Sequence, residues 1–376
     1  MINRTLQNSV LTRLGDRKVI IIYGARQVGK TTLLKEIFKN KADVMWLNGD
    51  ENYAKALLDD NNSERLRAII GKNKYVVIDE AQRVENIGLK LKIIYDNITD
   101  VKVVVSGSSS FALANSVNEP LTGRKWEFQL HPFSFEELVN EHGLLKELNL
   151  LEQRLLYGSY PEIVVKSEDA HPLLMQLSSS YLFKDVLEFE QILKSNKLLN
   201  LLHALAFQVG SEVSLSELSR LISLDVKTID KYLTLLEKSF VIFSISSFSR
   251  NLRNEIKKGR KIYFVDNGIR NALINQFAPL LNRNDVGLLW ENYLISERRK
   301  YLSNNNIFKS TFFWRTHSQQ EIDYIEEQDG FLATYEFKFN ANKKVKERPL
   351  FTKTYPNSSF TVVNKENYDQ FLLGKI

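Results

Sequence analysis

Apolar runs separated by short polar loops mark the first third of the chain. A continuous apolar run of about 4–8 residues is typical of a strand that is buried on both faces of a sheet. Between the runs, residues such as Leu33, Leu34 and Ile37 recur at the spacing of one helical face. The runs occupy residues 19–23, 43–48, 74–79 and 101–106, and an alternating run at 125–130 predicts a last strand. This pattern predicts an α/β core with an open parallel sheet.

The rest of the chain is first helical and then mixed. Residues 150–200 carry apolar residues at helical spacing and predict a helical connector. Residues 214–248 read as a helix, a turn at 223–225, a second helix and a strand, which is the outline of a winged helix-turn-helix. Beyond residue 259, a helix at 287–302 precedes several predicted strands. We therefore predict domains at residues 1–150, 151–195, 196–260 and 261–376.

The loop after the first apolar run carries a phosphate-binding motif. It reads "GARQVGKT" and matches G-x-x-x-x-G-K-[ST] in full. Gly24 and Gly29 let the backbone turn so that its N–H groups point at phosphate oxygens, and Lys30 reaches the β- and γ-phosphates. An accidental match has a chance on the order of one per cent in a chain with few glycines. The predicted nucleotide-binding residues are Gly24, Ala25, Arg26, Gln27, Val28, Gly29, Lys30, Thr31 and Thr32.

Two carboxylates stand at the end of a later apolar run. "KYVVID" ends in Asp79 and is followed by Glu80. Because the carboxyl ends of parallel strands meet at one edge of a sheet, we expect Asp79 opposite Thr31, where the two would hold Mg²⁺. Glu80 is then placed to polarise the attacking water. Acidic residues often end an apolar strand, so this interpretation depends on the upstream phosphate loop.

Two further features can contribute to such a site. The run ending at Ser106 leads into Ser108, Ser109 and Ser110, where a polar residue can sense the γ-phosphate. A plain turn rich in Gly and Ser is an equally good interpretation. Arg124 precedes the last predicted strand, and an arginine at the edge of a nucleotide site can stabilise charge on the transferred phosphoryl group. An ordinary surface arginine is the alternative, and the sequence leaves open whether Arg124 faces its own site or a neighbour's.

A helix and a basic segment point to a DNA partner. Lys227, Thr228, Lys231 and Tyr232 lie on the second helix of the winged-helix outline, at positions that can face a DNA groove. The segment 250–261 follows as a basic wing with Arg250, Arg253, Lys257, Lys258, Arg260 and Lys261. Winged-helix folds also serve as structural or protein-binding modules, and a basic run is often a solvated turn. A protein partner therefore stays open.

The C-terminal region has residues at the spacing of a metal-dependent nuclease. Glu336 and Lys338 share one face of a predicted strand, Asp323 lies on the preceding strand, and Glu291 lies on the earlier helix. The spacing resembles the D…E-x-K core of the PD-(D/E)xK nuclease superfamily, in which carboxylates hold Mg²⁺ and the lysine positions the attacking water. Cross-strand charge pairing explains the same residues without catalysis. The proline that precedes the first aspartate in that superfamily is absent here, since Ile322 precedes Asp323.

Composition restricts the chemistry. The chain of 376 residues exceeds what one compact core usually holds. Its net charge of +6 permits a nucleic-acid partner without requiring one. The absence of Cys excludes disulfides, thiolate zinc sites and Cys nucleophiles, and the five His have no metal-ligand spacing. With no signal-peptide pattern and no apolar segment of membrane-spanning length, we expect a cytoplasmic protein without a membrane partner.

Taken together, these motifs resemble a family of archaeal and bacterial AAA-type ATPases. The matching stretches are "GARQVGKTTLLK", "VVIDEAQ", "VSGSSS", "LTGRKWEFQLHPFSFEEL" and "YGSYPEIV". The resemblance covers nearly the whole chain, and the C-terminal part is similar to a domain of uncharacterised function that is often fused to these ATPases. It implies binding and hydrolysis of ATP, with Lys30, Thr31, Asp79 and Glu80 in the nucleotide and magnesium roles and Arg124 as a candidate arginine finger.

One position departs from that family. Ser159 follows Gly158 where the family more often has a second glycine. We expect a Mg²⁺-requiring ATPase with a winged-helix module and a nuclease-like C-terminal domain. Its hydrolysis would drive either DNA binding or processing, or a nucleotide-dependent switch on a protein partner with the C-terminal domain as a scaffold. An oligomer is compatible with either.

Overall fold

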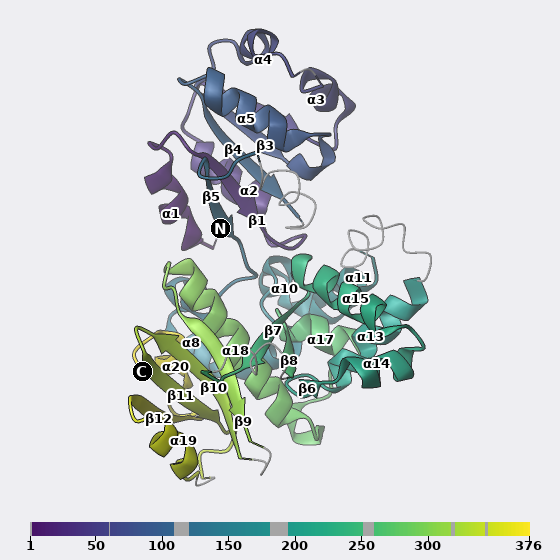
Figure 1. Cartoon of the computed structure of the whole chain (residues 1–376), viewed down its shortest axis with the longest axis vertical. Helices are drawn as coiled ribbons and strands as arrows, with labels where there is room; N and C mark the ends of the chain where they lie inside the picture. Colours follow the sequence, from purple (N-terminus) through teal and green to yellow (C-terminus); the bar gives the residue numbers. More distant parts are fainter. Residues whose placement is uncertain are drawn as a thin grey trace. The chain divides into compact units, whose positions relative to one another are not determined.

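The chain folds into two compact units (Figure 1). The first is formed mainly by residues 2–133, and the second mainly by residues 134–180, 195–237 and 241–376. The computed structural model describes residues 2–59, 61–108, 120–180, 195–250, 259–316, 320–342 and 345–376. None of the helices in these ranges has the length and apolarity that a membrane crossing needs.

A five-stranded parallel sheet forms the centre of the first unit. Its strands are β1 (Val19–Tyr23), β2 (Val44–Asn48), β3 (Tyr75–Asp79), β4 (Lys102–Gly107) and β5 (Lys125–Gln129), in the order β2-β3-β4-β1-β5. Every neighbouring pair is parallel, so all five carboxyl ends lie at one edge of the sheet. The predicted strands and the parallel sheet are thereby confirmed, with β4 between β1 and β3.

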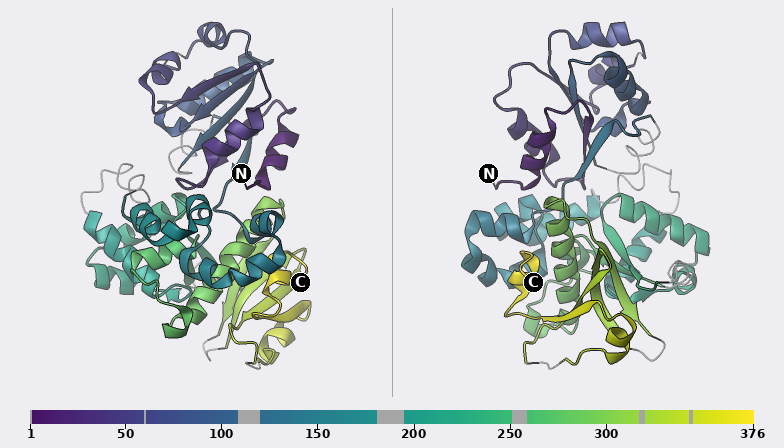
Figure 2. Two further views of the ribbon diagram at one scale, coloured as in Figure 1. Left: turned by 180° about the vertical axis from the view of Figure 1, so that it is seen from behind. Right: turned by 60° about the vertical axis from the view of Figure 1, so that its left-hand side comes forward.

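Helices cover both faces of this sheet (Figure 2). One apolar cluster joins alternate residues of β1, β3 and β4 to the helices of one face, and β1 is buried along its whole length. Coverage on both sides explains the continuous apolar runs of the sequence. The helices are α1 (Leu6–Arg13), α2 (Lys30–Phe38), α3 (Asn52–Leu57), α4 (Ser63–Ile70) and α5 (Ile87–Asn97), and a 3₁₀ turn η1 (Ala81–Arg83) follows β3.

The second unit contains a mixed seven-stranded sheet. Its strands are β6 (Glu212–Val213), β7 (Ile242–Ser247), β8 (Arg260–Phe264), β9 (Ser310–Arg315), β10 (Glu321–Gln328), β11 (Phe331–Phe337) and β12 (Ser358–Val363), in the order β12-β11-β10-β9-β7-β8-β6. The pairs β7–β9 and β11–β12 are parallel and the others are antiparallel. The predicted border between residues 260 and 261 falls inside β8, and the division into four domains stays a prediction.

The second unit also contains a series of helices. They are α7 (Phe135–His142), α8 (Leu144–Asn149), α9 (Leu151–Tyr157), α10 (Pro161–Val165), α11 (Ala170–Ser180), α13 (Ser195–Phe207), α14 (Leu215–Ile222), α15 (Val226–Lys238), α17 (Asn267–Leu273), α18 (Val286–Asn304), α19 (Pro349–Thr354) and α20 (Tyr368–Leu372). Helix α14, the turn after it, helix α15 and strand β7 are the elements predicted for residues 214–248. Asn292 attaches α18 to β8, because its side-chain amide bonds both the N–H and the C=O of Phe264.

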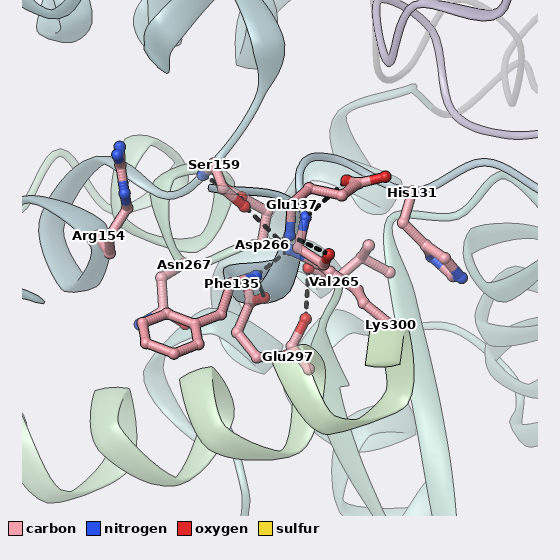
Figure 3. A network of polar contacts seen from close by, with 12 residues as sticks. His131, Phe135, Glu137, Arg154, Ser159, Val265, Asp266, Asn267, Glu297 and Lys300 are labelled. Atoms are coloured by element: carbon pink, nitrogen blue, oxygen red, sulfur yellow. Dashed lines mark hydrogen bonds and ion pairs between the residues drawn. The ribbon is translucent and has the colours of Figure 1, made fainter. Parts of the chain in front are cut away.

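A buried polar network begins at the Gly158–Ser159 loop of the second unit (Figure 3). The N–H of Ser159 donates to Asp266 Oδ2 at 2.7 Å, and Asp266 Oδ1 accepts from the N–H groups of Gly268 and Ile269 at the start of α17. Gly158 has φ +70°, and a Cβ there would lie 1.9 Å from Asp266 Oδ1. The glycine is therefore required both by its backbone conformation and by the close approach of Asp266.

The network continues into α18 and α7. Lys300 Nζ donates to Ser159 Oγ at 2.9 Å and pairs with Glu297 Oε1 at 2.6 Å. Glu297 Oε2 accepts from the N–H of Phe135 at 2.7 Å. Burial raises the pKa of Asp266 and of Glu297, and the ammonium of Lys300 opposes both shifts. The hydroxyl of Ser159 thus accepts a hydrogen bond from Lys300. A second glycine at this position would have no hydroxyl to accept it.

We predict that Gly158→Ala destabilises the second unit. The new methyl group displaces Asp266 and the left-handed backbone disfavours alanine, so the free energy of unfolding should fall by about 3 kcal/mol. Urea denaturation followed by tryptophan fluorescence measures this change. Gly287→Ala, in the first turn of α18 with no atom within 4 Å of the new Cβ, is the matched control and should change stability by less than about 1 kcal/mol. Equal midpoints for Gly158→Ala and the wild type would contradict the account.

Candidate active site

The phosphate loop connects β1 to α2 in a conformation that requires its glycines. A Cβ at Gly24 would lie 2.3 Å from the carbonyl oxygen of Leu130, which follows β5. Gln27 and Gly29 have φ values of 61° and 95°, both in the left-handed region. Helix α2 begins directly after Gly29, so its N-terminus, with its positive partial charge, lies at the loop.

Lys30 is buried at the first position of α2. Its Nζ donates to the carbonyl oxygens of Gly24 at 2.9 Å and Ala25 at 3.0 Å. The ammonium group therefore lies against the first turn of the phosphate loop. An ammonium at this position can exchange carbonyl oxygens for phosphate oxygens with little movement of the backbone.

Asp79 joins the phosphate loop to two strands. Its Oδ2 accepts from Thr31 Oγ1 at 2.5 Å, and its Oδ1 accepts from Ser106 Oγ and from the N–H of Glu80. These contacts bring α2, β3 and β4 together at the carboxyl edge of the sheet. A hydroxyl and a carboxylate in contact are the oxygen donors that Mg²⁺ takes from a protein when phosphate oxygens and water complete its shell. The residues present therefore fit ATP with Mg²⁺.

Glu80 is held in a turn beside Asp79. Its φ of 49° lies in the left-handed region, an uncommon conformation that is often found at functional sites. Glu80 Oε2 accepts from Gln82 Nε2 at 2.5 Å, and the same amide donates to Ser108 Oγ at 3.0 Å. Gln82 Oε1 is buried and has no hydrogen-bond partner among the described residues. Ser106 and Ser108 thus both lie in this site, whereas Ser109 and Ser110 are outside the described residues.

Two residues of this region were not predicted. Gln82 lies two residues after Glu80, and this proximity in sequence is the signal from which its place in the site could have been predicted. Arg4 lies far away in sequence, and its guanidinium donates to the carbonyl oxygens of Val28 and His131. The same group lies 4.7 Å from the ring centroid of Phe133. No sequence motif marks this arginine, which fixes a carbonyl group of the phosphate loop.

Arg124 lies at the opposite edge of the sheet. Its carbonyl oxygen accepts from the N–H of Val19 at the start of β1, whereas the phosphate loop follows the end of β1. A five-residue strand spans roughly 17 Å. The guanidinium pairs with Asp96 at 3.0 Å. The structure therefore does not bring Arg124 to the phosphate loop of its own chain.

The C-terminal residues expected to share a site are brought together. Lys338 Nζ lies 2.8 Å from Glu336 Oε1 and 3.8 Å from Asp323 Oδ2. Arg348 also contacts Glu336 Oε1, at 3.3 Å, while Glu336 Oε2 is buried without a hydrogen-bond partner in the described part of the chain. Burial and the carboxylates of Glu291 and Glu336 raise the pKa of Asp323 to about 7.

Glu291 belongs to an adjoining ion cluster. Its Oε1 accepts from Lys261 Nζ at 3.2 Å and from Tyr263 Oη at 2.7 Å, and Lys261 also pairs with Glu321 at 2.5 Å. Within the described ranges, no group of three or more His, Asp or Glu side chains is arranged to hold a metal ion. Lysines and an arginine neutralise these carboxylates instead.

The residues expected to face DNA divide into accessible and inaccessible ones. Lys227 and Lys231 are exposed on α15. Thr228 is bound to Asp225, and Tyr232 is buried in the helix packing, so Tyr232 does not face a groove.

In the basic segment 250–261, too, some of the residues expected to contact DNA are inaccessible or already paired. Lys261 is buried in the ion cluster with Glu291, and Arg260 pairs with Asp230 at 2.6 Å. Arg250 lies 5.5 Å from the ring centroid of Tyr355. Because it is buried, Lys261 is not available to DNA. The sequence pattern could not reveal this, since it shows the charge of a residue and not its burial. Arg253, Lys257 and Lys258 lie outside the described residues.

Comparison with known proteins supports the ATPase core. Residues 16–139 match a family described as an AAA domain, and residues 148–280 and 286–375 match two families described as domains of unknown function, DUF8612 and DUF4143. An uncharacterized protein of Methanocaldococcus jannaschii is 24% identical over 96% of this chain and 84% of its own length. An uncharacterized protein of Mycobacterium tuberculosis is 25% identical over 85% of this chain and 70% of its own length.

The fold is also found among solved structures. A Walker-type ATPase of Pyrococcus abyssi superposes with a TM-score of 0.53 at 15% identity, over 73% of this chain and 96% of that protein. With the AAA-domain match, this fold supports an AAA-type ATPase with a P-loop core. The predicted class of the ATPase core is confirmed at this level. The winged helix and the nuclease-like domain stay predictions.

Proposed function

We propose that this chain binds ATP with Mg²⁺ and hydrolyses it at the carboxyl edge of the five-stranded sheet. The observation that carries the proposal is the contact of Asp79 with both Thr31 and Ser106, from three different elements beside the phosphate loop. Buried carboxylates need hydrogen-bond donors or a cation, and this one lies where the phosphates of a nucleotide would end. The AAA-domain match of residues 16–139 supports the same activity.

Each residue has a role in nucleotide binding. The N–H groups of the phosphate loop and the N-terminus of α2 would bind the phosphates. Lys30 would exchange the carbonyl groups of Gly24 and Ala25 for the β- and γ-phosphate oxygens. Thr31 and Asp79 would hold Mg²⁺, which neutralises phosphate charge when it is bound.

Glu80 is the residue that would activate water. Its carboxylate is oriented by Gln82, which in turn is fixed by the hydroxyl of Ser108, the residue directly after β4. Gln82 Oε1, which is buried and has no hydrogen-bond partner in the described part of the chain, offers an acceptor for a hydrogen of the same water. The two side chains together would hold a water molecule and take its proton as the phosphoryl group is transferred.

Arg124 would act only on a second copy of the chain. Its place at the amino edge of the sheet, paired with Asp96, separates it from its own phosphate loop. An arginine supplied by a neighbour stabilises transition-state charge just as one supplied within the chain does. An arginine-finger role for Arg124 therefore implies an oligomer in which the edges of two sheets meet.

Glu80→Gln tests the hydrolytic role. The amide cannot take a proton from water, so we expect turnover to fall at least about 100-fold while ATP affinity stays within about twofold. ATP turnover is measured by phosphate release and affinity by titration of a fluorescent ATP analogue. Glu36→Gln, on the exposed face of α2 beside Lys39, is the control and should keep wild-type turnover. Undiminished turnover by Glu80→Gln would exclude Glu80 as the base.

A DNA substrate is the second part of the proposal. It is favoured by the two exposed lysines of α15 and by the convergence of Asp323, Glu336 and Lys338. In this account Asp323 and Glu336 would hold a divalent cation and Lys338 would position a water molecule near a phosphodiester. The alternative is a nucleotide-dependent switch on a protein partner, with these side chains serving only as ion pairs.

Duplex DNA distinguishes these two accounts. If DNA is the substrate, supercoiled plasmid should raise ATP turnover several-fold, and the effect should weaken steeply between 50 and 200 mM salt. Lys227→Ala with Lys231→Ala should remove the stimulation and leave basal turnover unchanged. Nicking of the plasmid, resolved on agarose, should disappear in Asp323→Asn. If ATP turnover is the same with and without DNA, and the plasmid stays intact, the nucleotide-dependent switch on a protein partner is favoured.

A further inference from the structure

A cavity of about 450 Å³ lies in the second unit between α18 and strands β7, β9 and β10. It forms where β7 and β9 part, because these strands pair only at Ser246–Phe312 and Ser247–Phe313. Residues 242–245 of β7 and Thr311 of β9 lie beyond that pairing and line the cavity. The volume is in the range of sites that bind small organic molecules. The phosphate loop and the Asp323 cluster contribute no residue to it.

Arg299 of α18 lines this cavity, and its guanidinium has no acceptor among the described residues. Its carbon lies 4.6 Å from the ring centroid of Phe243, and within the described chain the group makes no hydrogen bond and no ion pair. Burial lowers the pKa of Arg299, and the negative charge of Glu237 partly offsets this shift without contacting the guanidinium. The preceding residue, Arg298, differs in this respect because it bonds both oxygens of Glu326. A half-buried guanidinium without an acceptor is costly unless a ligand or water satisfies it.

Hydroxyl groups surround the same space. Ser244, Ser303, Thr311 and Tyr324 line the cavity, and none of their hydroxyls bonds to another described residue. Ser303 follows Arg299 by four positions, so both side chains lie on one face of α18. Four hydroxyls and a guanidinium are a set of donors that suits an oxyanion.

The remaining wall is apolar. It consists of branched aliphatic side chains from β7, α18 and the segment after α18: Ile242, Ile245, Ile295, Leu302 and Ile307. A ligand that fills the cavity therefore needs an apolar body as well as a charged group.

The charges at the wall favour an anion. The charged side chains that line the cavity are Arg299, Lys309 and Glu237, and together they carry a net charge of one positive unit. Lys309 is 2.8 Å from Glu326, which Arg298 already neutralises. No carboxylate lies within ion-pair distance of Arg299 among the described residues.

We propose that this cavity binds a small amphipathic anion, an organic carboxylate or a phosphate monoester. Its charged group would bond to Arg299 and the surrounding hydroxyls, and its apolar part would lie against the isoleucines and Leu302. The site is separate from the nucleotide site, and its ligand is independent of whether the chain hydrolyses ATP.

Isothermal titration of the full chain tests this site with three probes. Sodium octanoate and octyl phosphate carry the two candidate head groups on the same apolar chain, and octanol carries neither charge. We expect saturable binding of one molecule per chain for at least one anion, with octanol at least about tenfold weaker. The tighter of the two anions identifies the head group. Arg299→Met, which keeps the aliphatic stem, should weaken anion binding at least about tenfold.

Controls keep the result decisive. Arg220→Met, at an exposed position of α14, should leave binding unchanged. Circular dichroism checks that each variant is folded. If Arg299→Met fails to fold, Thr311→Val removes one lining hydroxyl at nearly constant volume and should weaken binding about threefold. The proposal is overturned if neither anion binds saturably, if octanol binds as tightly as the anions, or if folded Arg299→Met or Thr311→Val binds them as the wild type does.

Discussion

The carboxylate of Asp79 is the point on which the first unit depends. A buried carboxylate must find donors, and here they come from α2, from β4 and from the backbone of the turn that holds Glu80. This is possible because all five strands are parallel and end at one edge, with β4 between β1 and β3. The same geometry brings Ser108 to Gln82, and Gln82 to Glu80. A phosphate-binding loop and a water-activating residue thus become parts of one connected set of side chains.

The second unit is organised by buried charges of a different kind. Asp266, Lys300 and Glu297 connect the Gly158–Ser159 loop to α17, α18 and α7. These contacts give a physical reason for two of the recognisable sequence stretches, "YGSYPE" and "PFSFEEL". The sheet of this unit is continuous from β6 to β12, and α18 contacts strands of two predicted domains: Arg299 lies over Phe243 of β7, and Arg298 bonds Glu326 of β10. The separation of β7 from β9 leaves the cavity at Arg299.

Sequence patterns predicted the parts of the structure that depend on local spacing. The phosphate loop, the five strands and the convergence of Asp323, Glu336 and Lys338 follow from motif and period alone. Contacts made across the fold could not be predicted in this way: Arg4 bonds Val28, which is 24 residues away in sequence, and Arg299 lies at the cavity beside β7 and β9 with no hydrogen-bond partner among the described residues. Burial was the other source of error, since Lys261 and Tyr232 look like surface residues in sequence and lie inside the second unit. The sequence left open whether Arg124 faces its own nucleotide site or a neighbour's, and strand direction puts it at the edge of the sheet opposite the phosphate loop of its own chain.

The central claim is that the edge of the five-stranded sheet hydrolyses ATP, and Lys30 tests it most directly. ATP hydrolysis by the purified chain should depend on Mg²⁺ and should be lost in Lys30→Ala, because the Lys30 ammonium lies against Gly24 and Ala25, in the loop that would bind the phosphates. Lys35→Ala, on the same helix but outside the loop, should keep the wild-type rate. Turnover by folded Lys30→Ala equal to that of the wild type would contradict the account.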